Sequence, residues 1–266
     1  MLIKDAIDLN KRTFISIVGA GGKSTLFSLL AHELYKEKKN IILTTTTHMF
    51  ADQLIPFANK VSLIENNNEK IILKRMNYFF KKGKYSELIL IHHRLQSELG
   101  EKVTGPSTDF LKKCWMSGYA DYFIVEADGA RGKSIKSPAA HEPVICDSTT
   151  DVIGVVGIDA LGLTLSERNV FRPVLFSQLT GLKIGEKICI NDIVALICHP
   201  NGLFKNIPLH SKAHLFINKA DSNLEKQSAR KIAIQVLKSK DSKIDEILIG
   251  SGYNKTDPVT EIVKRR

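Results

Sequence analysis

A glycine-rich loop followed by a lysine and two hydroxyl side chains is the part of this sequence best suited to chemistry. It follows an apolar run and reads Gly19, Ala20, Gly21, Gly22, Lys23, Ser24 and Thr25. Glycines let backbone amides turn inward around phosphate oxygens, because they have no Cβ. We expect this loop to bind nucleotide phosphates, with Lys23 on the β- and γ-phosphates and Ser24 as a ligand of Mg²⁺.

The spacing of this loop differs from that of the standard phosphate-binding pattern. The pattern G-x-x-x-x-G-K-[ST] requires a glycine where this chain has Ile17, and the first glycine here is Gly19. A simple glycine turn between a strand and a helix is the alternative interpretation. The order of strand, loop, Lys-Ser-Thr and helix favours a shortened phosphate loop.

Two carboxylates follow another apolar run, at residues 122–125. They are Glu126 and Asp128, and Gly129 and Arg131 come directly after them. A nucleotide site needs a carboxylate to bind Mg²⁺, directly or through water, and to orient an attacking water. We expect Glu126 and Asp128 to bind the metal and to act in catalysis with Lys23, while Arg131 and Lys133 neutralise phosphate charge.

A possible base-recognition element, Asn218-Lys219-Ala220-Asp221, follows the apolar run 213–217. It matches the N-K-x-D element that reads guanine in GTPases. An aspartate carboxylate can accept hydrogen bonds from N1–H and the exocyclic amine of guanine, a donor pair that adenine lacks. The asparagine would brace the loop, and the lysine stem would lie over the purine ring. Residues 249–252 could close over the base.

Histidines near these segments are weaker candidates. His48, which follows four threonines, and His141 both lie in loops after site-bearing strands, so we expect them near the site. We interpret His199, His210 and His214 as structural residues.

The elements that must position these residues alternate between strand and helix. Strands are predicted at 13–18, 40–45, 60–64, 87–92, 121–126, 152–157, 213–217 and 245–249. Helices are predicted at 23–37, 107–117, 167–181, 190–198 and 223–238. Continuous apolar strands in this alternation indicate a mainly parallel, doubly wound α/β sheet, in which ligands bind at the carboxyl ends of the strands. We expect one nucleotide-binding domain over residues 1–266.

Composition indicates an ordinary globular protein, with 43% hydrophobic residues and a net charge of +10. The lysines are dispersed, with local concentrations at 70–84 and 226–243 that fit solvated faces, so we expect no nucleic-acid partner. No membrane span or secretory leader is apparent, which favours the cytoplasm. We expect buried free thiols at all four cysteines, Cys114, Cys146, Cys189 and Cys198.

With these segments assembled, the chain resembles the YqeC family. The matching stretches are VGAGGKST, TTTTHM, KVTGPS, VEADGARG, SPAAHEPVI, GVVGIDALG, RPVLFSQLTG, HPNGLFK and INKAD. Members are described as accessory or selenium-cofactor biosynthesis proteins of selenium-dependent hydroxylases. The resemblance implies a cytoplasmic protein that helps molybdenum hydroxylases mature, with the hydroxylase or its cofactor-processing proteins as partners. It is compatible with a homo-oligomer.

A wider resemblance bears on mechanism. The stretch from Ile124 to Gly129 is similar to the metal-binding strand of GTPases that deliver nickel to hydrogenase and urease, which also carry N-K-x-D. This chain lacks their cysteine-centred metal site. The short G-x-G-G-K-S loop is more similar to that of the Mur ligases, which use ATP to form an acyl phosphate.

The sequence therefore predicts a P-loop-like protein that binds Mg–GTP, or ATP, and hydrolyses it slowly. Three alternatives stay open. The first is an ATP- or GTP-dependent kinase or ligase acting on a small cofactor precursor. The second is a scaffold that binds nucleotide without hydrolysis, and the third is a nucleic-acid binder.

Overall fold

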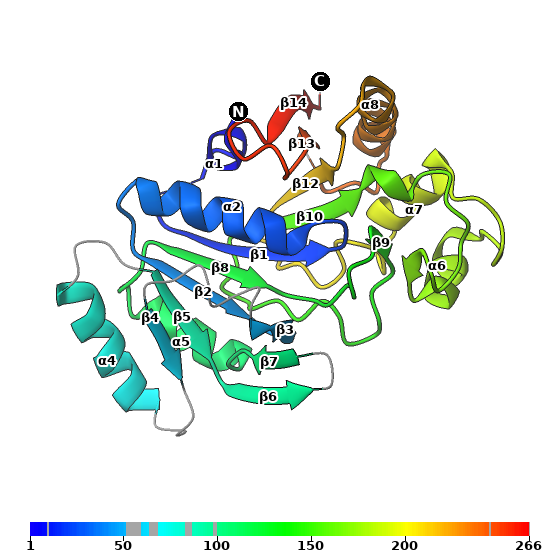
Figure 1. The fold of residues 1–266 in the computed structure, drawn as a ribbon. Helices are drawn as coiled ribbons and strands as arrows, with labels where there is room; N and C mark the ends of the chain where they lie inside the picture. The colour runs from blue at the N-terminus through cyan, green and yellow to red at the C-terminus, as the bar shows by residue number, and fades with distance from the viewer. Residues whose placement is uncertain are drawn as a thin grey trace.

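The computed structural model describes residues 1–9, 11–51, 60–63, 69–82, 87–97, 100–244 and 246–265. Its main feature is a nine-stranded sheet in which one edge strand is antiparallel and the other strands are parallel (Figure 1). The strand order is β14 (Val259–Lys264), β13 (Glu246–Gly250), β12 (Lys212–Asn218), β10 (Asp151–Gly157), β1 (Thr13–Gly19), β8 (Tyr122–Glu126), β2 (Ile41–Thr45), β5 (Glu87–Ile91) and β4 (Lys60–Leu63). The mainly parallel α/β sheet predicted from the sequence is confirmed.

Helices cover both faces of this sheet (Figure 1). One face carries α1 (Ile3–Ala6) and α2 (Lys23–Lys36). The opposite face carries α4 (Glu69–Lys82), α5 (Thr108–Met116), α6 (Pro173–Thr180), α7 (Ile190–Cys198) and α8 (Asn223–Lys238). Alternate residues of β1 point to the two layers, because successive side chains of a strand face opposite sides. Ile15 and Ile17 belong to the core cluster that contains α2, whereas Phe14 and Val18 belong to clusters on the other face.

A second, three-stranded antiparallel sheet was not predicted. It consists of β3 (His48–Phe50), β7 (Gly100–Thr104) and β6 (His93–Ser97). These strands are short and mostly polar, so they lack the apolar pattern on which strand prediction depends. At Gly105 the backbone runs directly against β2, and a Cβ there would lie 1.3 Å from the carbonyl oxygen of Thr45. The small sheet is thereby held close to the carboxyl end of β2.

The predicted helix at 167–181 is too long. Residues Val170–Phe171 form β11, which pairs in parallel with β9 (Ile135–Lys136), and helix α6 begins only at Pro173. A proline suits the first helical position but disfavours helical geometry in the residue before it. Arg172, the N-cap of α6, is not helical and has a left-handed conformation with φ of 64°.

Other predictions near the surface have mixed outcomes. Much of the basic segment 70–84 lies in α4, whose apolar side packs Ile72, Met76 and Phe80 into the core. The cysteines are free, but Cys189 is exposed, so the prediction that all four are buried is wrong.

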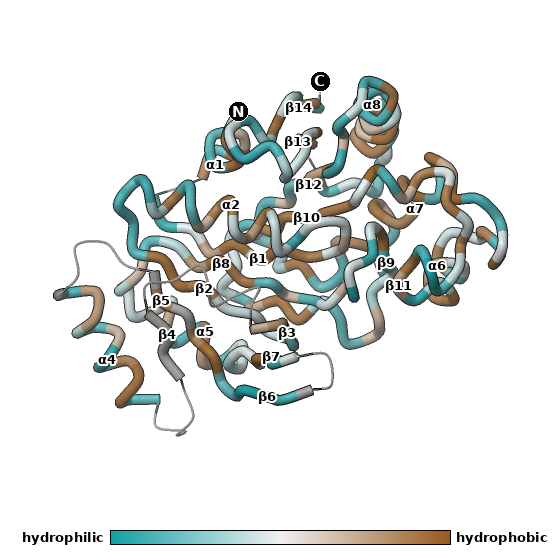
Figure 2. The backbone as a smooth tube through the Cα atoms, in the orientation of Figure 1, coloured by the Kyte–Doolittle hydropathy of each residue, from teal (hydrophilic) through white to brown (hydrophobic). Residues whose placement is uncertain are grey.

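Figure 2 shows apolar residues along β1 and β10 and a mixed pattern along α4. In the described part of the chain, no helix combines the length and hydropathy needed to cross a membrane.

Candidate functional site

The glycine loop connects β1 to α2 in a conformation that only glycine accommodates easily. Gly19, Gly21 and Gly22 have φ values of 97°, 86° and 120°. A Cβ on Gly21 would lie 2.2 Å from the amide nitrogen of Gly157, and one on Gly22 would lie 2.2 Å from Nδ2 of Asn218. The loop is therefore packed against two neighbouring strands, β10 and β12. Any larger residue at Gly21 or Gly22 would collide with them.

The N-terminus of α2 leaves backbone donors available. Gly22 is the N-cap and no side chain caps the helix. The first helical hydrogen bond runs from the amide of Leu26 to the carbonyl oxygen of Gly22 at 3.0 Å. The first amides of a helix have no partner within it and carry partial positive charge, so this end suits an anion.

The Lys23 side chain is buried among oxygen atoms. Its Nζ lies 2.8 Å from the carbonyl oxygen of Gly19, 3.3 Å from Oδ1 of Asp128 and 3.9 Å from Oε1 of Glu126. Burial alone would lower the pKa of Lys23, but the charges of Asp128 and Glu126 outweigh it and raise the pKa. The ammonium is therefore charged and already positioned beside the loop.

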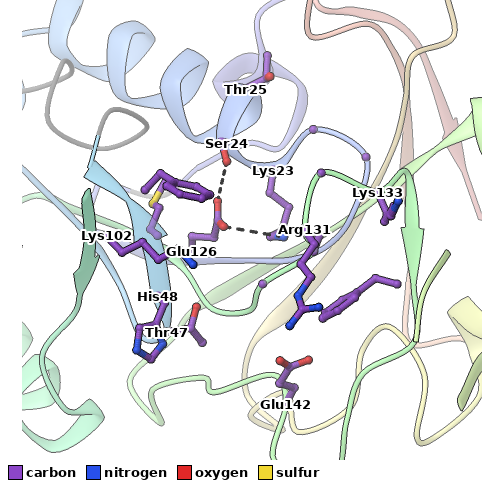
Figure 3. A pocket seen from close by; sticks show the side chains of 18 of the residues that line it. Lys23, Ser24, Thr25, Thr47, His48, Lys102, Glu126, Arg131, Lys133 and Glu142 are labelled. Atoms are coloured by element: carbon purple, nitrogen blue, oxygen red, sulfur yellow. Dashed lines mark hydrogen bonds and ion pairs between the residues drawn. The ribbon is translucent and has the colours of Figure 1, made fainter. Parts of the chain in front are cut away.

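Glu126 and Asp128 occupy different positions, although only one residue separates them in the sequence. Glu126 ends β8, the direct neighbour of β1, and lines the cavity beside the loop. Its Oε2 accepts a hydrogen bond from Ser24 Oγ at 3.1 Å (Figure 3). Burial raises the pKa of Glu126, and the attraction of Lys23 offsets this only in part. Glu126 and Ser24 thus present two oxygen atoms side by side.

Asp128 is 2% exposed and braces the loop. Its two oxygens accept from the amide of Gly19 at 3.1 and 3.0 Å, and Oδ2 lies 2.8 Å from Nζ of Lys136. Together with the contact to Lys23, these interactions engage both carboxylate oxygens. Asp128 is not among the residues that line the cavity.

A chain of buried ion pairs continues from Asp128 and was not predicted from the sequence. Lys136 Nζ lies 2.7 Å from Oε2 of Glu142, and Glu142 also forms a two-pronged pair with Arg172. Burial would raise the pKa of Glu142, but hydrogen bonds from Arg172 and Lys136 outweigh it and lower the pKa to about 2. The sequence signal is His141-Glu142-Pro143, of which only His141 was predicted to lie near the site. The His141 side chain is exposed, whereas Glu142 lines the cavity.

Arg131 approaches the cavity from the loop after β8 (Figure 3). Its side chain stacks on Phe171, with Cζ 5.2 Å from the ring centroid. Such a contact orients the guanidinium without neutralising it. Across the residues that the structure describes, Arg131 has no ion-pair partner.

The Asn218-to-Asp221 element lies next to the loop, and its residues have separate roles. Asn218 donates from Nδ2 to the carbonyl oxygen of Gly21 at 2.7 Å and accepts at Oδ1 from the amide of Gly252 at 2.8 Å. Lys219 lines the cavity, and its Nζ lies 2.8 Å from Oδ2 of Asp159. Asp221 is exposed and is not among the lining residues.

A cavity of about 770 Å³ unites most of these groups (Figure 3). Sequence-predicted residues that line it are Gly21, Gly22, Lys23, Ser24, Thr25, His48, Glu126, Arg131 and Lys219. Lining residues that the sequence did not single out include Phe50, Lys102, Phe171 and Tyr253. Five other predicted residues support the loop or lie nearby without lining the cavity: Gly19, Ala20, Asp128, Asn218 and Asp221.

The oxygen atoms of Ser24 and Glu126 could bind a hard cation whose remaining ligands come from phosphate and water. Over the described residues there is no cluster of three or more His, Cys, Asp or Glu side chains that could hold a metal ion. Mg²⁺ commonly takes one or two protein oxygens and completes its shell with phosphate and water. Ser24 Oγ and the Glu126 carboxylate fit that pattern.

Comparison with known proteins places the chain in a family. Residues 15–174 match the family model described as YqeC protein. The chain is also 32% identical over 252 residues to the uncharacterized protein YqeC of Escherichia coli strain K12, which covers 94% of this chain and 91% of that protein. The family match includes the glycine-lysine loop, Glu126 and the ion-pair chain up to Arg172. The chain belongs to the YqeC family.

Proposed function

We propose that this protein binds Mg–GTP at the glycine-lysine loop, with a P-loop NTPase-like fold, and hydrolyses it slowly. The observation that carries the proposal is the convergence of Lys23, Ser24 and Glu126 beside the uncapped N-terminus of α2. A charged ammonium, two oxygen ligands and free helix amides are the groups that a triphosphate with Mg²⁺ requires. Parallel strands with these residues at their carboxyl ends support the same assignment.

Each residue has a role that follows from its position. Lys23 neutralises the β- and γ-phosphates, and Ser24 and Glu126 hold Mg²⁺ directly or through water. When bound, Mg²⁺ would supply charge neutralisation at the phosphates. Asp128 acts as a positioning residue, because its oxygens are engaged by Gly19, Lys23 and Lys136. Arg131, which also lines the cavity, would complete the neutralisation.

Guanine recognition is proposed for Asn218, Lys219 and Asp221. Asn218 connects the phosphate loop to Gly252, so the loop and segment 249–252 share one brace. The Lys219 ammonium is held by Asp159 while the residue lines the cavity, which leaves its stem available to a purine ring. The exposed Asp221 carboxylate would accept from the paired donors of guanine.

Resemblance to the YqeC family is the basis for the biological role that we propose. On that basis the nucleotide cycle assists assembly or insertion of the cofactor of a selenium-dependent molybdenum hydroxylase in the cytoplasm. The partners would be that hydroxylase or its cofactor-processing proteins.

The proposal is tested by calorimetric titration of Mg–GTP into the wild type and Lys23→Met. Methionine keeps a long apolar stem and removes the ammonium. We expect binding by the wild type and at least a 100-fold loss in the variant, with Lys226→Met on α8, outside the cavity lining, as the matched control. Equal affinity of Lys23→Met and wild type, with both proteins folded by circular dichroism, would contradict the assignment.

A kinase or ligase acting on a small cofactor precursor is the second candidate. It is favoured by the extent of the cavity, which reaches beyond the loop to Phe50 and Lys102 on the small antiparallel sheet. Turnover that requires a second substrate would support it. Tight nucleotide binding without turnover would instead indicate a scaffold.

A further inference from the structure

The small antiparallel sheet presents an ordered set of side chains to the cavity. In the pairing of β3 with β7, Phe50 lies opposite Lys102, and His48 lies opposite Thr104. Residues two apart on one strand share a face, and directly paired residues do too. His48, Phe50 and Lys102 therefore occupy one face of this sheet, and all three line the cavity.

Lys102 is held in place by an aromatic ring and lacks a balancing charge. Its Nζ lies 5.0 Å from the centroid of Phe50. A ring in this position orients the ammonium but leaves its charge uncompensated. Lys23, Lys219 and Glu142, by contrast, all have ion-pair partners. Within the ranges that the structure describes, Lys102, Arg131 and Lys133 line the cavity without one, and the Lys133 ammonium donates instead to the carbonyl oxygen of Arg168.

The wall that carries Lys102 is anchored. The close approach of Gly105 to Thr45 fixes the end of β7 against β2, and the amide of His92 donates to the carbonyl oxygen of Thr104 at 2.7 Å. Lys102 and Arg131 thus enter the same cavity from two supported elements, the small sheet and the loop after β8 (Figure 3).

We propose that Lys102, with Phe50 and His48, forms a second anion subsite for the phosphate or carboxylate group of a small-molecule ligand that binds together with the nucleotide. This inference rests on the proposed function, which assigns the loop end of the cavity to the nucleotide. Arg131 lines the same cavity and, in this proposal, serves both subsites. An oxyanion is the chemistry that two uncompensated cations favour, because a guanidinium and an ammonium both donate strong hydrogen bonds to it.

The test uses two simple anions as probes. Orthophosphate or malonate is titrated into protein saturated with Mg²⁺ and β,γ-imido-GTP, so that the loop is already filled. We expect one anion to bind with an affinity in the millimolar range, and the better probe distinguishes a phosphate from a carboxylate subsite. Lys102→Met should weaken this binding at least tenfold and leave nucleotide affinity unchanged. Lys226→Met serves as the control for removal of a surface charge.

The outcomes separate this inference from the proposed function. If nucleotide binds but neither probe does, or if Lys102→Met has no effect on the probes, the second subsite is wrong and the nucleotide site stands. If no nucleotide binds, the proposed function fails, and the probes are titrated into the free protein. Phosphate or malonate binding that is lost in Lys102→Met and kept in Lys23→Met then supports the subsite. The opposite pattern overturns it.

Discussion

Asn218 and Gly21 are joined by a hydrogen bond of 2.7 Å from the asparagine Nδ2 to the glycine carbonyl oxygen. The same side chain accepts from the amide of Gly252, so one buried asparagine connects three segments that are far apart in the sequence. A buried amide that satisfies two backbone groups fixes their relative position, because leaving either unpaired is costly. The geometry of the phosphate loop therefore depends on a residue of the predicted base-recognition element.

Removal of this brace should loosen the loop. We expect Asn218→Ala to lower the free energy of unfolding by about 1–3 kcal/mol, since a buried carbonyl and a buried amide lose their partner. Nucleotide affinity should fall at least tenfold. Urea unfolding and calorimetry measure the two effects. A variant with wild-type stability and wild-type affinity would show that the brace is dispensable.

Gly22 should tolerate no side chain while Asn218 is present. Its φ is 120°, and a Cβ would lie 2.2 Å from Asn218 Nδ2. Gly100 is a matched control, because its φ is 121° and nothing in the described structure lies within 4 Å of its Cβ position. Both alanine variants carry backbone strain of about 1–2 kcal/mol, but only Gly22→Ala adds the clash. We expect it to be the less stable variant and to lose nucleotide binding.

A double variant tests the cause of that effect. If the clash with Asn218 dominates, Gly22→Ala and Asn218→Ala together should destabilise less than the sum of the single changes. Strict additivity in urea unfolding would assign the cost of Gly22→Ala to the backbone alone.

The buried ion-pair chain should contribute to stability far more than surface pairs do. Asp128→Asn removes the charge that Lys23 and Lys136 both face, and breaking a buried pair in this way typically costs about 3–5 kcal/mol. Glu261→Gln, which breaks an exposed pair with Arg230, should cost less than about 1 kcal/mol. Comparable losses for the two variants in chemical unfolding would argue against the chain as a structural element.

The lowered pKa of Glu142 predicts that part of the free energy of unfolding is lost in acid. Its pKa is lowered from 4.5 to about 2 in the folded protein by Arg172 and Lys136. Between these two pH values the carboxylate stays charged in the folded state but binds a proton in the unfolded state. This contribution is complete above about pH 5 and is lost as the pH falls toward 2.

The matched experiment follows unfolding of wild type and Glu142→Gln by urea from pH 7 to pH 3. The wild type should be the more stable protein at pH 7, and the difference should shrink as the pH falls. A difference that is independent of pH would contradict the assignment.

Local sequence patterns were sufficient for the parallel sheet and for much of the site. Continuous apolar strands, the loop from Gly19 to Lys23, and Glu126 at the end of β8 all carry local signals. The topology places β8 next to β1, so residues more than a hundred positions apart, Ser24 and Glu126, meet at 3.1 Å. Alternation of strands and helices could suggest this meeting but not its geometry.

Features that depend on partners distant in the sequence could not be predicted. The sequence does not indicate that the Asp128 carboxylate is already bonded to Gly19 and Lys136. Glu126 and Asp128 were therefore both predicted to bind the metal. Lys136, Glu142 and Arg172 become a chain only after folding. The small sheet of β3, β7 and β6 was not predicted because its strands are short and mostly polar. The position of Lys102 at the cavity was therefore not predicted either.

Nucleotide binding and base preference are both measured by a calorimetric panel of GTP, ATP, CTP and XTP with and without Mg²⁺. It is performed on the wild type and on Asp221→Asn. We predict that the wild type binds GTP most tightly and requires Mg²⁺, and that Asp221→Asn shifts the preference toward XTP, because an amide replaces the carboxylate that accepts from guanine. Failure of the folded wild type to bind any of the four nucleotides would contradict the account.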